Sequence, residues 1–413
     1  MIRLLLTALL VAAGVPFAAP AGVAAPAGVA APDNCAQPGQ PYKPVPWAQR
    51  LLAPERVWPF SRGSGVTVAV LDSGVDAGHP QLRGHVAAGF DAVLGHGPAN
   101  DDCVGTGTQV AGVIAAQPTP DVGFAGLAPG VTILPVRIVA SAGFGGGVPP
   151  DVLARAIDWA VANDADVIDV SIAGYGADPA VQAAVANAAA KGVIVVAAVG
   201  DLGDSGGDVP VPYPAGYPGV IGVGAIDPAG NRWSRSQYGN YVDLVAPGVA
   251  VATLQRGGGM VPEVSGTGVA SGLVAGTAAL LRPRHGELTT GEIVRRLLTG
   301  ATPAPLGPIS QEYGRGVVNP YAAVNYRPAA GTPAALPGLI RPASGPESVF
   351  ARSRRAALAG ALGAVLVALI VVATAVTLPR GRRRFWRPAL AASPPPAPEE
   401  AEPGPPVPLF EER

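Results

Sequence analysis

The sequence predicts an α/β fold in which helices cover both faces of a parallel sheet. Apolar runs without alternating polar positions are typical of central parallel strands, because such strands are buried on both faces. Five such runs lie at residues 66–72, 131–138, 167–172, 193–199 and 220–225. Stretches of helical character lie between them, at residues 108–116, 152–163 and 180–191. This alternation of strands and helices is what a parallel sheet with helices on both sides requires.

The first predicted strand ends in a carboxylate, Asp72. In open α/β sheets the ligand site lies beyond the carboxyl ends of the strands. Residues that follow predicted strands, namely Ser73, Gly200 and Asp201, are therefore expected to line a cleft together with Asp72.

The composition excludes several classes of protein. Hydrophobic residues make up 49% of the 413 residues, which excludes disorder throughout the chain. The 56 glycines show no three-residue period, which excludes collagen, and two cysteines exclude a disulfide-dense scaffold. The net charge of −1 gives no electrostatic support for binding a polyanion, so we expect no nucleic-acid partner.

Residues 1–30 are predicted to be a secretory signal peptide. The chain begins Met-Ile-Arg and continues into an apolar run that ends in small residues, which is the order typical of such a peptide. The sequence Ala-Pro-Ala-Gly-Val-Ala occurs twice between residues 19 and 30, so the cleavage point stays open. The alternative is an uncleaved anchor, but the apolar run is too short to span a bilayer comfortably.

Residues 356–378 are predicted to form one transmembrane helix. This run carries no charge and is long enough to cross a hydrocarbon core of roughly 30 Å. Arginines flank it on both sides, with the larger cluster after it, at 380, 382, 383, 384 and 387. The positive-inside rule then places the C-terminus in the cytoplasm, and the signal peptide places the body outside it. We therefore expect a single-pass cell-membrane protein that contacts lipid through one helix.

Two further segments are predicted to lie outside any packed domain. Residues 327–355 are rich in Pro, Ala and Gly, which is typical of a linker. Residues 379–413 carry Pro-Pro-Pro and several glutamates and are predicted to be a short disordered tail.

Four segments carry motifs in a fixed order along the chain. They are Val-Leu-Asp-Ser-Gly-Val at 70–75 with His-Pro-Gln-Leu at 79–82, Gly-Leu-Ala-Pro at 126–129 with Val-Arg at 136–137, Val-Asp-Leu-Val-Ala-Pro-Gly at 242–248, and Ser-Gly-Thr-Gly-Val-Ala-Ser at 265–271. They resemble the aspartate, post-histidine, pre-serine and serine segments of the subtilisin-like serine proteases, the subtilases or peptidase S8. The resemblance implies a subtilisin-like fold, with its domain over residues 64–326.

The order of segments along the whole chain resembles the mycosins. These are the membrane-anchored subtilases of actinobacterial type VII secretion systems, and the family is associated with stabilising the secretion complex separately from proteolysis. The resemblance implies that the partners are subunits of a type VII secretion membrane complex and that the domain is extracytoplasmic.

Residues 31–63 resemble the N-terminal extension of the mycosins. The resemblance implies a disulfide between Cys35 and Cys103. An exported domain with two cysteines usually oxidises them, and closing a loop of this length would restrict the unfolded chain by roughly 4 kcal/mol. Two unpaired buried cysteines are the alternative.

The motifs imply that most of the catalytic machinery has been replaced. Asp72 keeps the carboxylate that would orient an imidazole. Thr106 stands at the histidine position, and a hydroxyl is not a general base near neutral pH. Gly268 stands at the serine position and has no side chain. Asp201 stands at the oxyanion position, where an ionised carboxylate accepts hydrogen bonds and repels a developing oxyanion.

No other residue is predicted to restore the chemistry. The four histidines, at 79, 85, 96 and 285, are interpreted as structural or surface side chains. Ser265 and Ser271 flank Gly268, but a helical turn of about 5 Å separates Ser271 from the reacting position. The aspartates at 101, 102, 204 and 208 show no metal-ligand spacing and are interpreted as solvated loop carboxylates, and residues 143–147 lack a phosphate-loop pattern. We therefore expect no metal and no cofactor.

Three functions stay open from the sequence. The first is a catalytically dead pseudoprotease that stabilises the secretion complex. The second is a serine-type endopeptidase with residual or rearranged activity, and Asp72 is the only residue that supports it. The third is a non-cleaving peptide-binding module, because residues 171–174 resemble the edge segment on which subtilases pair with a substrate backbone.

Overall fold

The computed structural model describes residues 35–141, 147–206, 209–285, 288–305, 307, 309–325 and 349–383. The chain divides into two units, Met1–Pro328 and Ala329–Arg413. The predicted signal peptide, most of the predicted linker and most of the predicted tail lie outside the described residues.

The first unit is built on a seven-stranded sheet in the order β2-β3-β1-β4-β6-β8-β9, and every neighbouring pair is parallel. The strands are β1 (Thr67–Asp72), β2 (Phe90–Asp91), β3 (Thr132–Arg137), β4 (Val167–Val170), β6 (Ile194–Ala198), β8 (Val220–Ile226) and β9 (Leu244–Pro247). Five of them match the five predicted apolar runs. The sequence interpretation missed the short edge strand β2 and did not assign β9, which is too short for a clear run.

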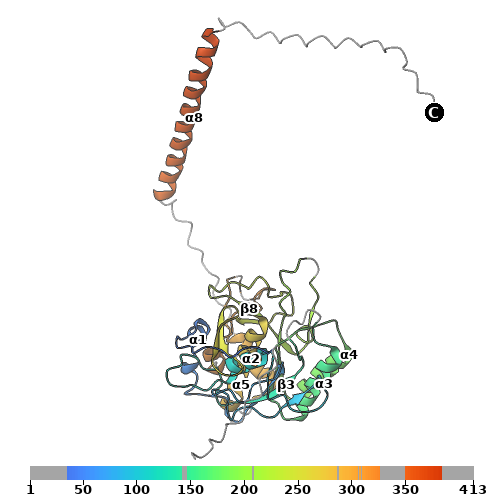
Figure 1. Ribbon diagram of the computed structural model, residues 1–413. Coiled ribbons are helices and arrows are strands. Elements are labelled where there is room, and N and C mark those ends of the chain that lie inside the picture. The colour runs from blue at the N-terminus through green and yellow to red at the C-terminus, as the bar shows by residue number, and fades with distance from the viewer. Residues whose placement is uncertain are drawn as a thin grey trace, which may run out of the picture. The chain divides into compact units, whose positions relative to one another are not determined.

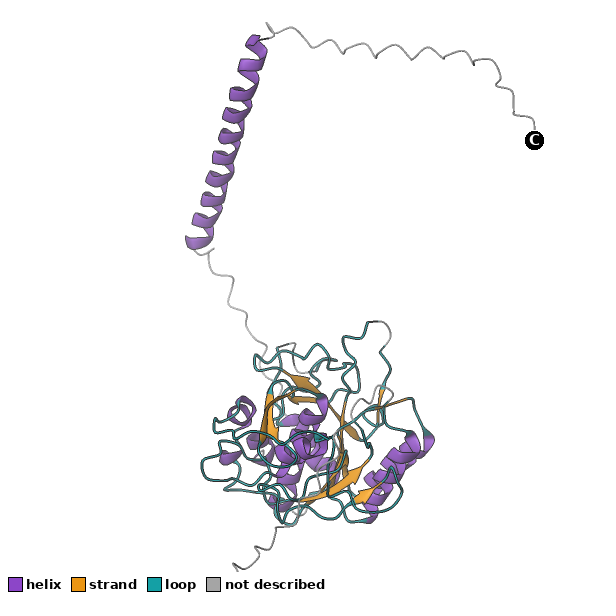
Figure 2. Ribbon diagram, in the orientation of Figure 1, coloured by secondary structure: helices purple, strands orange, loops and turns teal. Residues whose placement is uncertain are grey.

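Helices cover both faces of this sheet (Figures 1 and 2). The helices are α2 (Thr106–Ala115) and α5 (Thr267–Arg284) on one face, and α3 (Pro150–Ala162) and α4 (Pro179–Ala190) on the other. Alternate residues of β1 enter separate cores, with Val68 and Val70 in one and Ala69 and Leu71 in the other. Because both faces of each strand are buried, the strands need the continuous apolar sequence from which they were predicted. The predicted α/β, subtilisin-like fold class is confirmed.

Two small antiparallel sheets lie outside the seven-stranded sheet, and the N-terminal extension pairs with one of them. The sheets are β5 (Gly174–Tyr175) with β7 (Pro212–Tyr213), and β10 (Val251–Leu254) with β11 (Met260–Val264). The extension pairs with the second sheet, since Gln40 and Met260 exchange two backbone hydrogen bonds of 2.9 Å. The predicted disulfide between Cys35 and Cys103 is present and closes a separation of 68 residues.

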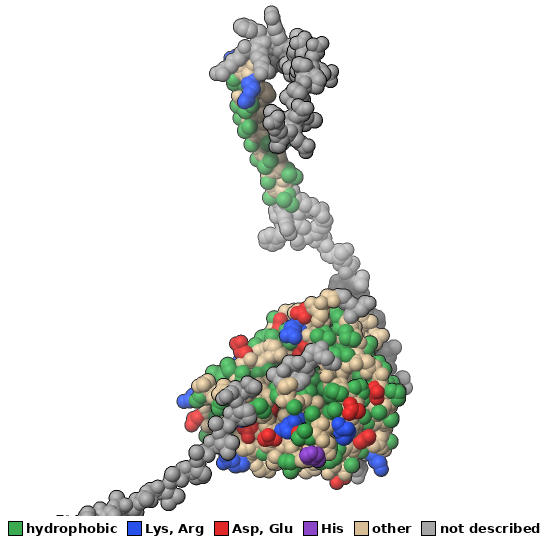
Figure 3. All heavy atoms as spheres, turned by 45° about the vertical axis from the view of Figure 1, so that its right-hand side comes forward, with side chains coloured by type: hydrophobic (Ala, Val, Ile, Leu, Met, Phe, Trp, Pro, Cys, Tyr) green, Lys and Arg blue, Asp and Glu red, His purple; other side chains and the backbone are tan. Residues whose placement is uncertain are grey.

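Four further helices complete the described helices of the unit. They are α1 (Trp47–Leu52) and the 3-10 helix η1 (Pro54–Arg56) in the extension, and α6 (Thr290–Thr299) and α7 (Pro320–Asn325) after α5. Helix α6 begins with a capping box, in which Thr289 and Glu292 bond each other's backbone N–H groups. On the face of the unit seen in Figure 3, acidic and basic side chains are intermingled among apolar and neutral ones.

The second unit contains one long helix, α8 (Val349–Arg383). Residues Ala356–Arg380 have a mean hydropathy of 2.7 and are long and apolar enough to cross a membrane. The helix begins seven residues before the predicted span at 356, inside the predicted linker, and continues into the predicted tail. Residues 349–355 contain neither Pro nor Gly, so the helix can begin before the apolar run without a residue that would break it.

Candidate functional site

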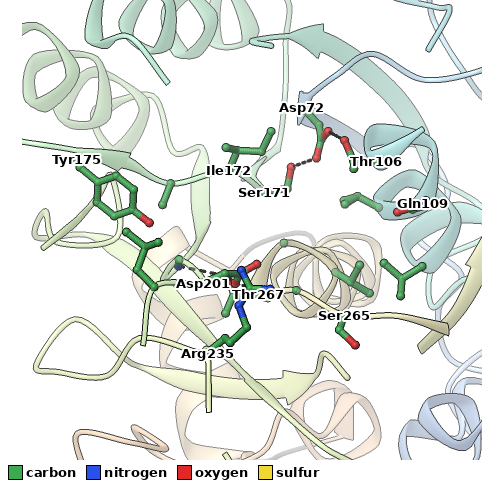
Figure 4. Close-up of a pocket in the computed structure, with 18 residues that line it drawn as sticks. Asp72, Thr106, Gln109, Ser171, Ile172, Tyr175, Asp201, Arg235, Ser265 and Thr267 are labelled. Carbon is green, nitrogen blue, oxygen red and sulfur yellow. Dashed lines mark hydrogen bonds between the residues drawn. The ribbon is translucent and has the colours of Figure 1, made fainter. Parts of the chain in front are cut away.

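A cleft of about 590 Å³ opens at the carboxyl ends of the central strands. The four residues at the predicted catalytic positions line it: Gly268 from the start of α5, and Asp72 from the end of β1, Thr106 from the start of α2 and Asp201 from the loop after β6 (the last three labelled in Figure 4). Gly200 lines the cleft as predicted, whereas Ser73 does not. Parallel strands place their carboxyl ends at one edge, which is why residues about 200 positions apart meet there.

Asp72 is 2% exposed and is held by three donors. Its Oδ1 accepts hydrogen bonds from the Ser73 N–H at 2.7 Å and from the Thr106 hydroxyl at 2.5 Å. Its Oδ2 accepts a hydrogen bond from the Ser171 hydroxyl (Figure 4). Burial raises the pKa of Asp72 above its ordinary range, although the hydrogen bonds from Ser171 and Thr106 oppose the rise. Both oxygens that could orient an imidazole are therefore occupied by hydroxyl groups.

Asp102 positions the start of α2, and with it Thr106. This carboxylate was interpreted as solvated, which is wrong, because it is 4% exposed. Its oxygens accept hydrogen bonds from the Ser73 hydroxyl at 2.9 Å, the Gly105 N–H at 2.7 Å, and the N–H and hydroxyl of Thr108. Since Gly105 offers no capping side chain, Asp102 satisfies the N–H groups that begin the helix.

Two of the other loop aspartates lie beside arginines and stay exposed, as their interpretation as solvated carboxylates expects. Asp101 lies 2.5 Å from the Arg137 guanidinium and its side chain stays 78% exposed. Asp204 lies 3.9 Å from the guanidinium of Arg235, and both side chains are about half exposed. Asp208 lies outside the described residues. Among the described residues, no group of three or more His, Cys, Asp or Glu side chains is placed to hold a metal ion.

Asp201 caps helix α5. Its Oδ1 accepts hydrogen bonds from the N–H of Thr267 at 3.0 Å and from the Thr267 hydroxyl at 2.7 Å (Figure 4). Gly266, at the N-cap position, has no side chain to do this. Burial raises the pKa of Asp201, while the two Thr267 bonds lower it. A carboxylate in this role supplies an acceptor to the cleft and no donor for an oxyanion.

Gly268 is held against the chain that follows β4. A Cβ atom at Gly268 would lie 2.4 Å from the carbonyl oxygen of Ser171 and 3.2 Å from the Ser171 Cβ. The 2.4 Å separation from a backbone atom is shorter than Cβ contacts found in proteins, so any side chain at 268 requires Ser171 to move. No sequence signal reveals this contact, because it joins residues from two distant segments.

The remaining hydroxyls near Gly268 are engaged elsewhere. The Ser265 Oγ lines the cleft and accepts a hydrogen bond from the N–H of Ala250 at 3.1 Å. Ser271 is fully buried and donates to the carbonyl of Gly268 at 2.9 Å. Neither hydroxyl has an imidazole or amine partner in the described residues.

None of the four histidines, all within the described residues, lines the cleft. His79 is buried, with its Nε2 at 2.9 Å from the Gly259 carbonyl and its Nδ1 accepting from the Gln81 N–H. Burial lowers the pKa of His79. His85 and His285 bond the carbonyls of Val131 and Val324. His96 is exposed, so the interpretation of the histidines as structural or surface side chains agrees with all four positions.

A second buried carboxyl, which the sequence interpretation missed, lies below the cleft. Asp169 sits in β4, is fully buried, and neither of its oxygens has a hydrogen-bond partner. Burial raises the pKa of Asp169 well above its ordinary value; the nearby Ser271 opposes the rise, although its hydroxyl bonds the Gly268 carbonyl, and the charge of Asp72 adds to it. The polar residue within the apolar sequence Val-Ile-Asp-Val was the available signal.

The fold and the arrangement of this cleft define the class of the subtilisin-like serine proteases. A sequence profile described as the subtilase family, Peptidase S8, matches residues 63–316, and the chain belongs to this family. It is 38% identical over 261 residues to subtilisin from Bacillus pumilus, which covers 63% of this chain and 91% of that protein.

Solved structures of the mycosin type are also similar. One is the MycP3 protease from the type VII (ESX-3) secretion system, with a TM-score of 0.62 and 32% identity over 71% of this chain and 92% of that one. Another is MycP1 from Mycobacterium smegmatis, with a TM-score of 0.64 and 28% identity over 76% of this chain and 93% of that one. The predicted resemblance is confirmed: the chain fits a mycosin-type subtilase.

Proposed function

We propose that this chain is a membrane-anchored subunit of a type VII secretion complex that stabilises the complex without cleaving peptides. The observation that carries the proposal is the contact between Gly268 and Ser171, which leaves no room for a side chain at 268 unless Ser171 moves. The occupied carboxylate of Asp72 supports the same conclusion, because no imidazole lines the cleft. The fold, the disulfide and the apolar helix are present, whereas Thr106 and Gly268 stand at the predicted histidine and serine positions and only Asp72 remains of the three.

The anchoring proposed with this function has a defined orientation. Residues 356–378 cross the cell membrane, the subtilase domain lies outside the cytoplasm, and residues 379–413 form a short cytoplasmic tail. The arginine cluster after the apolar run supports this orientation. A signal peptide within residues 1–30 would direct export, and the complex subunits and membrane lipid are the proposed partners.

Native gels of gently solubilised membranes test the function. Cells that lack the protein are compared with cells that regain the wild-type chain, an Asp72→Asn variant, or a chain without residues 356–413. The proposal expects a large complex that contains the protein, is lost without it, and is restored equally by wild type and Asp72→Asn but not by the chain without the anchor. An intact complex in the absence of the protein would contradict the structural role. Failure of an Asp72→Asn variant whose domain unfolds at the same temperature as the wild type would favour a role for chemistry in the cleft.

A second candidate function is retention of a peptide in the cleft. The cleft remains open, and its wall includes Ser171, Ile172 and Ala173, while no described residue of the extension lines it. Binding of a fluorescent degenerate peptide mixture to the wild-type chain tests this function. A Ser265→Phe variant, at an exposed position in the cleft wall, should fill the cleft and lose the binding, whereas Ala177→Phe, at an exposed position outside it, should keep it. Equal binding by both variants would reject a cleft-bound peptide.

A further inference from the structure

Two aromatic rings and two arginines form one exposed patch on the subtilase domain. The aromatic–arginine patch consists of Arg56, Phe60, Arg284 and Tyr321, which come from η1, the loop after it, the end of α5 and α7. The rings of Phe60 and Tyr321 meet edge to face with centroids 6.2 Å apart. Arg56 lies 4.6 Å from the centre of the Tyr321 ring, and Arg284 lies 5.4 Å from that of Phe60.

The patch is open to solvent, and its two arginines have no ion-pair partner among the described residues. Phe60 and Tyr321 are 39% and 38% exposed. Arg56 and Arg284 are exposed, and neither has a carboxylate within ion-pair distance among the described residues. The two rings and the two guanidinium groups therefore present apolar area and positive charge at one place on the surface. Stacking on the rings holds the arginines in place without neutralising them.

The chain leaves the domain beside this patch. Asn325 ends α7 and donates a side-chain hydrogen bond of 3.1 Å to the carbonyl of Tyr321. Tyr321 and Asn325 are thus one helical turn apart, about 5 Å along the axis. The apolar span begins at Ala356, so the connecting residues can never carry this corner of the domain farther than roughly 100 Å from the start of the span.

We propose that the aromatic–arginine patch docks on the anionic headgroups of the membrane in which the chain is anchored. Aromatic side chains favour the boundary between water and hydrocarbon, and arginine binds phosphate through its planar set of donors. Each arginine near an anionic surface favours the docked state by on the order of fivefold. The anchor makes this contact intramolecular, so a modest affinity is sufficient to hold the domain at the surface. The inference rests on the membrane anchoring proposed above.

Spin-label accessibility in lipid nanodiscs tests the proposal with the full chain. Since the two cysteines form the disulfide, a cysteine introduced at Pro59, exposed next to Phe60, is the single labelling site under non-reducing conditions. An exposed position on α4, Ala186→Cys, carries the control label. The spin label at 59 should be shielded from a water-soluble paramagnetic relaxation agent in discs that contain phosphatidylglycerol. In discs of phosphatidylcholine alone it should be accessible to the agent. The label at 186 should be open in both.

Charge reversal identifies the residues responsible. The Arg56→Glu/Arg284→Glu variant should lose the shielding at 59, whereas a matched reversal of two exposed arginines outside the patch, Arg83→Glu/Arg315→Glu, should keep it. Hydrogen exchange of residues 55–62 in the unlabelled chain gives the same comparison without the introduced cysteine. Shielding that ignores lipid charge or survives the reversal of Arg56 and Arg284 overturns the proposal.

Three further outcomes distinguish a failure of the proposed anchoring, a failure of patch docking, and coverage of the patch by a protein. A chain that does not stay with the discs contradicts the proposed anchoring, whereas one that stays while the label at 59 is open in anionic discs contradicts only the patch. Shielding at 59 in native membranes but not in anionic discs would mean that a protein covers the patch, which also overturns lipid docking.

Discussion

Thr106 donates its hydroxyl to Asp72 across 2.5 Å, so the side chain at the predicted histidine position bonds the carboxylate that would have oriented an imidazole. The arrangement keeps a buried acceptor satisfied. It also explains how the chain can retain Asp72 as a structural acceptor when nothing else in the cleft matches the requirements of a catalytic triad.

We expect Thr106→Val to lower the stability of the domain by about 1–3 kcal/mol, because it leaves one oxygen of a buried carboxylate with a donor fewer. Thr106→Ser keeps the hydroxyl and should remain close to the wild type. Thermal unfolding of the wild type and both variants, monitored by tryptophan fluorescence, measures the difference in their midpoints. Equal midpoints for Val and Ser would show that the hydrogen bond contributes nothing.

The Thr106→His/Gly268→Ser variant should not become a protease. It restores the two missing residue types, but the Cβ at 268 would lie 2.4 Å from the Ser171 carbonyl, and Asp201 offers no oxyanion donor. Neither this variant nor the wild type should react with a fluorophosphonate probe. Labelling of the wild type that disappears in a single serine or threonine variant would instead establish a rearranged active site.

A matched pair of alanine variants tests the contact itself. Gly268→Ala should destabilise the domain, because Ser171 must move to admit the methyl group. Gly291→Ala, in α6 where nothing lies within 4 Å of the new Cβ, should be neutral or stabilising by up to about 1 kcal/mol. A Gly268→Ala variant as stable as Gly291→Ala would remove the steric argument against a nucleophile at 268.

Much of the fold could be predicted because its strands are buried on both faces. Runs such as 193–199 and 220–225 must be apolar to lie inside the sheet, so their positions are visible in the sequence. The short strands β5 and β7 could not be predicted, since two residues carry no periodicity. The motifs placed Asp72, Thr106, Asp201 and Gly268 at one cleft because their order along the chain is that of a known family.

Contacts between distant segments could not be predicted. The burial of Asp102 depends on donors from Ser73, Gly105 and Thr108, which the sequence alone does not bring together. The approach of Ser171 to Gly268 depends on how the end of β4 packs on α5. Both features arise from tertiary packing rather than from local propensity.

Removing the disulfide should destabilise the domain by about 4 kcal/mol, because the bond between Cys35 and Cys103 closes a loop across a separation of 68 residues. We expect Cys35→Ser/Cys103→Ser to unfold at lower temperature than the wild type and to match the wild type treated with reductant. An unchanged unfolding temperature would mean that the hydrogen bonds of the extension, such as those between Gln40 and Met260, hold it without the bond.

The stability of the domain should fall with rising pH through the ionisation of Asp169. This carboxyl has an ordinary pKa of 3.8, raised well above that value by burial in the folded state, so the unfolded chain releases the proton first. The wild type therefore loses stability relative to Asp169→Asn as pH rises from about 4 towards the folded pKa, by up to about 1.4 kcal/mol per pH unit, and the difference is constant above it. Urea unfolding of both proteins across this range measures the slope.

Asp158→Asn, at an exposed position on α3, is the control and should run parallel to the wild type. A pH-independent difference between the wild type and Asp169→Asn would show that Asp169 does not stay protonated in the folded state.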